Sequence, residues 1–173
     1  MVRLALPIPP QLTELLRDPT RFASYAVAPG ALPPRVVLDQ ARKVVSPDGR
    51  AYRWTAPHLI VFDGGVVGSI GGKGLLEEEQ EVEIGYNVAA SYRRRGIATL
   101  AIGLLTQLAN RDGLKVLAHV EPQNEASRRA LARNGYHLEA YIRLPDSLDL
   151  ERWAWSALPD EDEPPLEALD PAL

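Results

Sequence analysis

The spacing of apolar positions changes from two residues to three or four near residue 96. Residues 81–88 (EVEIGYNV) alternate polar and apolar side chains, as a strand with one buried face does. From residue 97, apolar side chains recur at 97, 100, 101, 104, 105 and 108, the spacing of one helix face. The pattern therefore predicts a strand over 81–88 and then a helix that starts on the arginines at 93–95 and ends near Arg111, with Asp112-Gly113 as its stop.

The same rules predict the remaining elements. Helices are expected over 10–17 and 34–45, each beginning at a proline, with a loosely extended stretch over 22–27. Strands are expected over 59–62 and 66–70 around the Asp63-Gly64-Gly65 turn, over 115–120, and over 136–144 and 149–156 as a final hairpin. One more helix is expected from an Asn124 N-cap to Asn134-Gly135. This order predicts an α/β fold with a sheet of mixed strand direction.

The junction at 93–98 (RRRGIA) has the chemistry of an anion site. Three cations in a first helical turn oppose the helix macrodipole, at about 0.3 to 1 kcal/mol each. A bound phosphate reverses this effect, because the free N–H groups of the turn then meet an acceptor and Gly96 permits close approach of the backbone. A solvated basic helix start is the alternative explanation.

Composition narrows the class of protein. The chain has 173 residues, 46% of them apolar, which suits a single domain over 1–156. The segment 157–173 is acidic and proline-rich, and we expect it to be disordered. Removing its six negative charges changes the formal net charge from −4 to +2, so the remainder is mildly basic. No leader-like segment or long apolar run occurs, so a cytoplasmic protein without membrane association is expected.

Several other chemistries do not fit the sequence. Without cysteine there can be no disulfide, thiolate metal site or cysteine nucleophile. Gly72-Lys73 is followed by glycine, not Ser or Thr, and no GxGxxG motif occurs, so the familiar nucleotide loops are absent. The three histidines lie far apart in sequence, so we expect no metal.

At this point the sequence resembles a known family. Residues 93–98 fit the Q/R-x-x-G-x-G/A signature of the GCN5-related N-acetyltransferases, and the resemblance extends over about 59–140. It includes EIGYNVAASYRRRGIATLAI, the strand KVLAHV and the segment EPQNEASRRALARNGYHLEA. The branch that it resembles most is that of the ribosomal-protein-alanine acetyltransferases, which often shows EIGY before the signature.

This resemblance implies a mixed, mostly antiparallel sheet flanked by helices, with a V-shaped cleft between the fourth and fifth strands, 81–88 and 115–120. Acetyl-CoA would lie in this cleft without a metal, with Asn124 on its pantetheine arm and the N–H of Val88 facing the thioester oxygen. The pyrophosphate would be held by the backbone of the turn, so that the cofactor-binding candidates are Val88, Arg93, Arg94, Arg95, Gly96, Ile97, Ala98, Thr99 and Asn124.

Two residues are candidates for the chemistry. Glu83 corresponds to the strand glutamate that accepts a proton from the amine, directly or through water, although an exposed structural glutamate would give the same pattern. Where many relatives have a tyrosine that protonates the thiolate, this chain has Leu131. Ser127, one turn earlier, could donate to the sulfur instead, or simply form local hydrogen bonds. Tyr136, Tyr141 and Trp54 fit packing roles better.

These observations predict an N-acetyltransferase that transfers an acetyl group directly to a primary amine in a ternary complex. The acceptor is either a protein N-terminus or a small molecule, and the protein could be a homodimer. A CoA-binding sensor or scaffold without catalysis is the first alternative. Nucleic-acid binding by the clusters at 93–95 and 128–133 is disfavoured, because no aromatic residues are interleaved with them.

Overall fold

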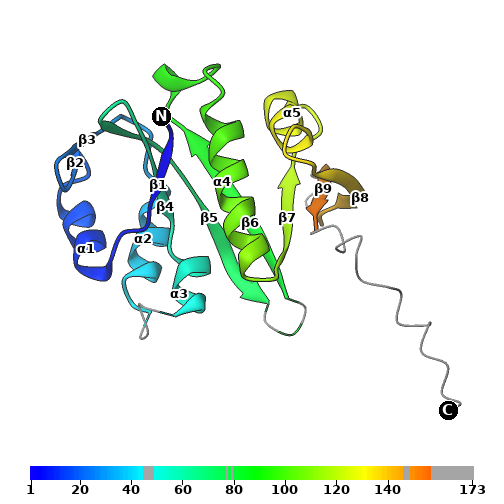
Figure 1. Ribbon diagram of the computed structural model, residues 1–173, viewed down its shortest axis with the longest axis horizontal. Coiled ribbons are helices and arrows are strands. Elements are labelled where there is room, and N and C mark those ends of the chain that lie inside the picture. The colour runs from blue at the N-terminus through cyan, green and yellow to red at the C-terminus, as the bar shows by residue number, and fades with distance from the viewer. Residues whose placement is uncertain (45–48, 77, 79, 146–148, 157–173) are drawn as a thin grey trace, which may run out of the picture.

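The computed structural model describes residues 1–44, 49–76, 78, 80–145 and 149–156, which form an open nine-stranded sheet with helices on both faces (Figure 1). The main sheet has the order β1-β4-β5-β6-β7-β9-β8, and the short β2 and β3 extend it beside β5. Most pairs are antiparallel, with β6–β7 and β3–β5 parallel. The segment 157–173, which we expected to be disordered, lies outside the described residues.

The elements in chain order are β1 (Arg3–Ala5), α1 (Pro9–Arg17), β2 (Arg21–Phe22), β3 (Tyr25–Val27), α2 (Arg35–Ala41), α3 (Arg50–Thr55), β4 (His58–Phe62), β5 (Gly65–Leu76), β6 (Glu81–Val88), the 3₁₀ helix η1 (Ala90–Tyr92), α4 (Ile97–Arg111), β7 (Lys115–Val120), α5 (Glu125–Ala132), β8 (His137–Arg143) and β9 (Asp149–Trp155).

The predicted fold class is confirmed, and most predicted elements lie within a residue or two of the observed ones. The sequence did not predict β1, α3, η1 or the division of the extended stretch 22–27 into β2 and β3. As a result the two strands that were expected to be fourth and fifth are β6 and β7. In addition, β5 continues to Leu76 where the prediction ended at residue 70, and α2 ends at Ala41 where the prediction ran to 45. The helix predicted to start on the arginines begins only at Ile97, because a left-handed Gly96 interrupts the backbone just before it.

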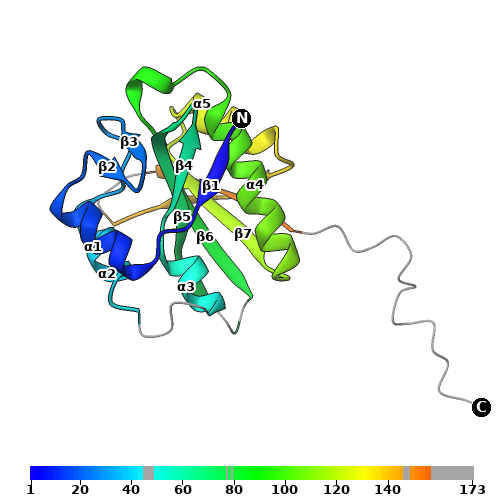
Figure 2. The ribbon, with the colours of Figure 1, turned by 60° about the vertical axis from the view of Figure 1, so that its left-hand side comes forward.

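Helix α4 lies on one side of the sheet and α1 and α2 lie on the other (Figure 2), and a separate hydrophobic cluster fills each face. On one face, α4 packs Ala101, Ile102 and Leu105 against inward residues of the central strands. On the other face, α1 and α2 contribute Leu12 and Leu38 to a cluster with β4 and β5. The sheet therefore separates a C-terminal side, with α4 and α5, from an N-terminal side.

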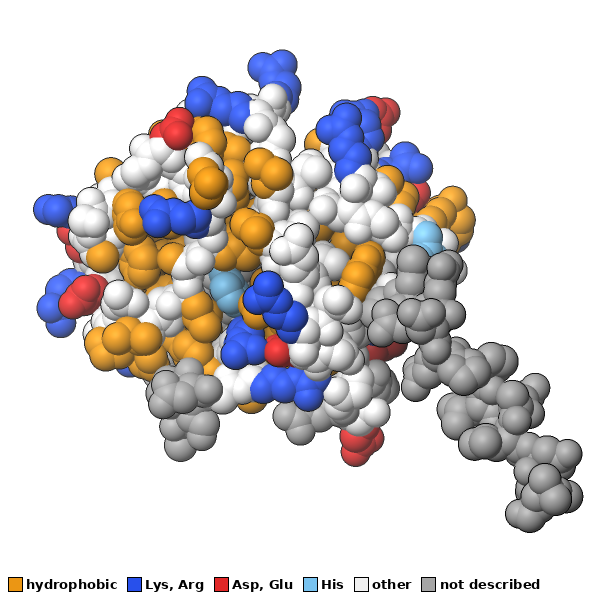
Figure 3. Space-filling model, viewed as in Figure 1, with side chains coloured by type: hydrophobic (Ala, Val, Ile, Leu, Met, Phe, Trp, Pro, Cys, Tyr) orange, Lys and Arg blue, Asp and Glu red, His pale blue; other side chains and the backbone are white. Residues whose placement is uncertain are grey.

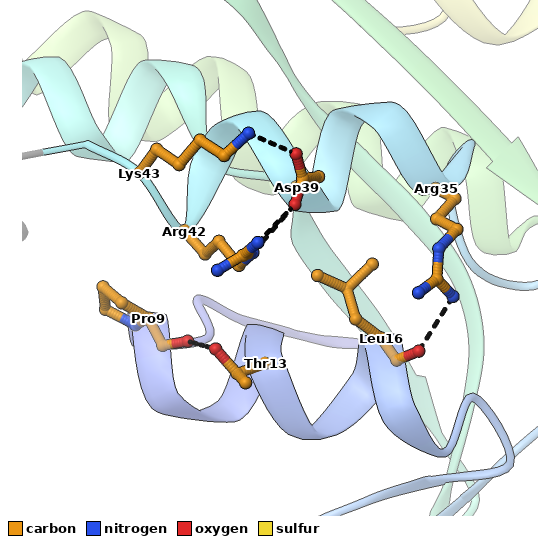
Figure 4. Close-up of polar contacts among 7 residues, drawn as sticks. All are labelled: Pro9, Thr13, Leu16, Arg35, Asp39, Arg42 and Lys43. Carbon is orange, nitrogen blue, oxygen red and sulfur yellow. Dashed lines mark hydrogen bonds and ion pairs between the residues drawn. The ribbon is translucent and has the colours of Figure 1, made fainter.

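Polar contacts to the backbone help to join the short N-terminal helices (Figure 4). Arg35 at the start of α2 donates from Nη1 to the carbonyl of Leu16 in α1, at 2.8 Å. Asp39, also on α2, accepts hydrogen bonds from Arg42 and Lys43 within its own helix region. Because each helix is short, such contacts and the burial of one face stabilise them more than intrinsic propensity does.

The unpredicted helix α3 holds the C-terminal end of α4. Arg53 donates to both carboxylate oxygens of Asp112 at 2.9 Å, and Trp54 Nε1 donates to one of them at 2.8 Å. The Trp54 side chain is completely buried, in agreement with the packing role expected for it. The hydrogen bonds of Arg53 and Trp54 to Asp112 thus link the N-terminal part of the chain to α4.

The strands β6 and β7 separate after a short parallel pairing. Their paired residues are Glu81 with Lys115, Val82 with Val116 and Glu83 with Leu117, and no later pair follows. Beyond this point β6 stays with β5, as far as Val88, while β7 stays with β9. The result is the predicted V-shaped opening.

Candidate functional site

The turn between η1 and α4 presents unpaired backbone donors. Arg94 and Gly96 both have left-handed conformations, with φ of 60° and 73°. For a non-glycine residue this conformation costs about 1 to 2 kcal/mol, so the strain at Arg94 points to a functional backbone shape. The first helical amide to bond back is that of Leu100, to the Gly96 carbonyl at 3.0 Å. The preceding amides, 97 to 99, are left without intrahelical partners at the positive end of the helix dipole.

This turn opens into a cleft of about 540 Å³ between α4, α5 and the end of β6. Figure 3 shows Lys and Arg side chains on both sides of the hollow between the N-terminal end of α4 and α5. Among the residues that the structure describes, its lining contains no carboxylate and four arginines, namely Arg93, Arg94, Arg129 and Arg133. The cleft therefore combines positive charge with backbone donors, which is the chemistry of a phosphate-binding site.

Every predicted cofactor-binding residue except Arg95 lines this cleft, and Ser127 does so as well. Arg95 instead lies over the ring of Tyr92, with its guanidinium carbon 5.2 Å from the ring centre. Arg93 donates from Nε to the carbonyl of Val88 at 3.0 Å, which fixes the turn to the end of β6. Within the arginine run, Arg93 and Arg94 line the cleft, Arg93 also positions the turn, and Arg95 packs on Tyr92.

The start of α5 faces the turn across the cleft. Asn124 caps the helix by accepting from the amide of Ser127, at 3.1 Å, through its side-chain oxygen. This leaves its NH₂ group available to the cleft. At the other end of α5, Asn134 donates to the carbonyl of Thr99 at 3.0 Å, and it packs so closely on Gly103 that a Cβ there would lie 2.8 Å from its Oδ1. These contacts fix α5 against α4 and so fix the width of the cleft.

The residue that replaces the family tyrosine does not face the cleft. Leu131 is completely buried in the core under α5. Ser127 is half-buried in the cleft wall, and its hydroxyl lies near that of Tyr86 on β6. Burial raises the pKa of Tyr86, and the Ser127 hydroxyl partly offsets that rise, so Tyr86 stays protonated at neutral pH. Behind it, Tyr136 and Thr106 share a buried hydrogen bond at 2.8 Å.

The amide of Val88 faces the opening of the V. Ala89 N–H donates to the Val67 carbonyl of β5, at 2.8 Å, whereas the carbonyl of Gln80 accepts from Lys115 of β7. Because successive backbone groups along a strand point to opposite edges, even-numbered residues of β6 direct theirs toward β7. At Val88, the β7 edge has no paired strand among the described residues, so this N–H is placed to donate to a ligand in the cleft.

Glu83 lies on the opposite face of the sheet from α4, in a polar cluster. Its Oε1 contacts Lys73 Nζ and lies 3.0 Å from His119 Nδ1. Burial alone would raise the pKa of this carboxyl, but the hydrogen bonds and charges of Lys73 and His119 outweigh burial and lower it. Glu83 is therefore firmly ionised and already shared by two donors.

A second hollow of about 420 Å³ lies on this N-terminal face. Its walls are largely apolar, and the lining comprises Leu32, Pro33, Pro34, Val37, Pro57, Ser69, Ile70, Gly71, Gly72, Lys73, Gly85, Tyr86 and Asn87. Tyr86 and Asn87 also line the first cleft, so the two hollows meet at the end of β6. Asn87 ties this junction to the loop before α2, since its Nδ2 donates to the Gly30 carbonyl at 2.7 Å and its Oδ1 accepts from Ser69 at 2.6 Å.

Sequence reasoning missed several residues of this region. Arg129 and Arg133 were noted only as a basic cluster, and their place in the cleft depends on how α5 packs on α4. Lys73 was considered as part of a nucleotide-binding loop, and that loop was excluded. His119 was discounted because the histidines lie far apart in sequence, yet two-residue alternation along 115–120 places it on the face of Lys115 and Leu117. That periodicity was the signal that could have found it.

Comparison with known proteins identifies the family. A family model described as an acetyltransferase (GNAT) domain matches residues 9–137, so the chain belongs to the GNAT acetyltransferase family. The resemblance inferred from the sequence is thereby confirmed. The chain has no match among curated proteins.

Solved structures of similar fold include proteins named RimJ and RimL and an aminoglycoside acetyltransferase. Mycobacterium smegmatis RimJ, in complex with CoA-disulfide, superposes with a TM-score of 0.66 at 23% identity, covering 90% of this chain and 82% of that one. RimL, a ribosomal L7/L12 α-N-protein acetyltransferase in complex with coenzyme A, gives 0.65 at 17% identity, covering 90% and 93%. The aminoglycoside acetyltransferase AAC(6')-Ib in complex with coenzyme A gives 0.60 at 21% identity, covering 91% and 95%.

Proposed function

We propose that the protein transfers the acetyl group of acetyl-CoA to a primary amine by direct attack in a ternary complex. The observation that supports this most is the meeting of two unlike hollows at Tyr86 and Asn87. One hollow is basic and edged by free backbone donors, while the other is largely apolar, with no carboxylate among the described residues that line it. A thioester at their junction would be open to attack from the second hollow.

In this proposal the donor occupies the cleft between α4 and α5. The amides at the start of α4 hold the pyrophosphate, and Arg93, Arg94, Arg129 and Arg133 neutralise phosphate charge. Asn124 donates its NH₂ group to the pantetheine arm. The amide of Val88 stabilises the oxyanion that forms at the carbonyl, the kind of contact whose loss costs about 100- to 1,000-fold in rate.

The chemistry proceeds without a covalent enzyme intermediate. The amine nitrogen forms a bond to the carbonyl carbon and loses a proton toward the Glu83 cluster, and the C–S bond then breaks with its electron pair on sulfur. Ser127 is placed to donate to the leaving sulfur. A thiol with a pKa near 8.5 departs readily, so Leu131 in the tyrosine position is compatible with turnover.

The second hollow favours an acceptor whose amine is attached to an uncharged or apolar group. Its charged lining residue is Lys73, a cation, and the prolines at 33, 34 and 57 give it an apolar wall. Polyamines and aminoglycosides carry several positive charges and need carboxylates to balance them. A peptide N-terminus with a small or apolar first residue fits better, in line with the description of RimL as an α-N-protein acetyltransferase.

A thiol-release assay with acetyl-CoA tests this proposal. The panel consists of short peptides with free N-termini, the same peptides with blocked N-termini, lysine peptides, spermidine and kanamycin. We expect turnover with free N-termini and none with blocked ones. Acetyl-CoA binding by calorimetry without thiol release on any amine would instead support a CoA-binding sensor, the alternative that Leu131 suggests.

A further inference from the structure

We propose that His119, oriented by Glu83, is the group that accepts the proton from the attacking amine. This inference rests on the proposed acetyl transfer and assigns its base to β7, on the opposite strand of the V from Glu83.

The first argument is the state of Glu83. Its Oε1 is engaged by both Lys73 and His119, and its pKa is lowered by these partners. A carboxylate that is held in its ionised form by two donors is a weak base, because protonation would require breaking those contacts. Glu83 is better suited to hold its neighbours in place than to take up a proton.

The second argument is the geometry of the imidazole. His119 Nδ1 lies 3.0 Å from the Glu83 carboxylate, which can accept a hydrogen bond but not donate one. In the neutral ring Nδ1 therefore carries the hydrogen and Nε2 carries the lone pair. Nε2 forms no hydrogen bond to any residue that the structure describes, and the side chain is 22% exposed. This arrangement of carboxylate, oriented imidazole and free nitrogen is that of a general base.

The third argument is position. Continuing the register of the β6–β7 pair, in which Glu83 lies opposite Leu117, places His119 opposite Gly85 where the strands have separated. Gly85 lines the second hollow and is followed on the same strand by the junction residues Tyr86 and Asn87. Its missing side chain keeps this part of the opening clear: a Cβ there would touch only the end of Lys73, at 3.4 Å.

The surrounding charges are compatible with this role. Lys73 approaches from β5 and Glu83 from β6, and Arg152 is the register partner of His119 on β9. Arg152 is itself paired with Glu139 on β8 at 2.8 Å, and Lys115 on β7 bridges Glu81 and Glu139. The cluster is thus nearly balanced in charge, with Glu83 as the carboxylate that contacts the imidazole.

The step balances as follows. The amine lone pair forms the C–N bond with the carbonyl carbon of the thioester, and the proton that the nitrogen loses moves to His119 Nε2. The C–S bond breaks with its electron pair on sulfur, which takes a proton from Ser127 or water. The imidazolium then gives its proton to solvent, and solvent restores the proton that Ser127 or water gave to sulfur, so amine and acetyl-CoA give amide and CoA thiol.

Two substitutions separate the roles of the pair. His119→Asn retains a side-chain N–H near the position of Nδ1 for Glu83 but removes Nε2, and kcat with the best free-N-terminus peptide should fall about 100-fold. Glu83→Gln leaves an acceptor for Nδ1–H, so it should lower kcat less than tenfold. The double variant should match His119→Asn alone. His137→Asn, an exposed histidine on β8, is the matched control and should behave as wild type.

Calorimetry with acetyl-CoA keeps the two hypotheses apart. Unchanged binding in His119→Asn, with kcat lost, supports the assignment. The opposite result is a kcat that falls about 100-fold in Glu83→Gln and stays near wild type in His119→Asn. In that case the base is Glu83 and the inference is wrong. If wild type binds acetyl-CoA but releases no thiol on any amine, the proposed function itself fails.

Discussion

The two faces of the sheet are built in different ways. On the face with α4 and α5, the residues that line the basic cleft come from one continuous stretch of chain, 86–133, which includes a long helix and a capped one. The opposite face is assembled from short elements before residue 56 and from outward residues of β5 to β7. Donor-side chemistry is therefore encoded locally, whereas acceptor-side chemistry depends on tertiary contacts, and substitutions on one face should leave the other intact.

The largest effect is expected at the pyrophosphate turn. Gly96→Leu places a side chain in the open space before α4, and acetyl-CoA affinity should fall about 1,000-fold, or about 4 kcal/mol. Gly64→Leu is a matched control, because Gly64 also has a positive φ and no atom within 4 Å of a Cβ, but lies in the β4–β5 turn. Calorimetry measures the acetyl-CoA affinity of both variants. Both replace a glycine of positive φ, so an affinity loss in Gly96→Leu alone reflects loss of the binding site and not backbone strain in general. Equal affinities in the two would remove the cofactor assignment.

The next effect concerns the pH dependence of stability, which a buried histidine on β4 controls. His58 is 4% exposed, and burial together with the charge of Arg53 lowers its pKa to about 4. In the unfolded chain the pKa of this histidine is about 6.5, so between pH 6.5 and 4 the unfolded state binds more protons than the folded state. The free energy of unfolding therefore keeps its full value above pH 6.5 and falls by about 3 kcal/mol as the pH drops to 4. In urea unfolding, His58→Leu should flatten this part of the pH profile. A profile as steep as that of wild type would contradict the prediction.

A smaller effect is expected from filling the second hollow. Val37→Trp narrows its α2 wall, so KM for the amine should rise about tenfold while acetyl-CoA affinity stays unchanged. Val36 provides the control, since this neighbour is 59% exposed and does not line the hollow. Steady-state kinetics with varied acceptor, combined with calorimetry, measures both quantities. An altered acetyl-CoA affinity in Val37→Trp alone would show that the faces are not independent.

The smallest effect is expected on the leaving-group side. Ser127→Ala should lower kcat about fivefold, since a thiol needs little help to leave. If Ser127 acts together with the nearby hydroxyl of Tyr86, Tyr86→Phe should add nothing to the Ser127→Ala variant, as a double-mutant cycle would measure. Additive losses would mean that the two hydroxyls act separately.

The sequence predicts the donor side of the molecule better than the acceptor side. The strand–turn–helix unit, Gly96 and the Asn124 cap were readable because apolar spacing and capping residues act over a few positions. β1 has three residues and α3 has six without a side-chain cap, so neither leaves a periodic pattern long enough to detect. The pairing of Glu83 with His119 depends on the β6–β7 register, and spacing along the chain does not encode it.

Tyr86 and Asn87 stand next to each other on one strand, and adjacent strand residues point to opposite faces. The unbroken register with β5, from Gly68 opposite Val88 to Gly72 opposite Ile84, holds that strand in place. An insertion within 84–88 would exchange the donor-facing and acceptor-facing residues and disable both sides at once. The loop at 30–34, which Asn87 contacts at Gly30, lies outside that strand and should be replaceable without shifting it. This arrangement allows acceptor preference to diverge in evolution while the donor machinery stays fixed.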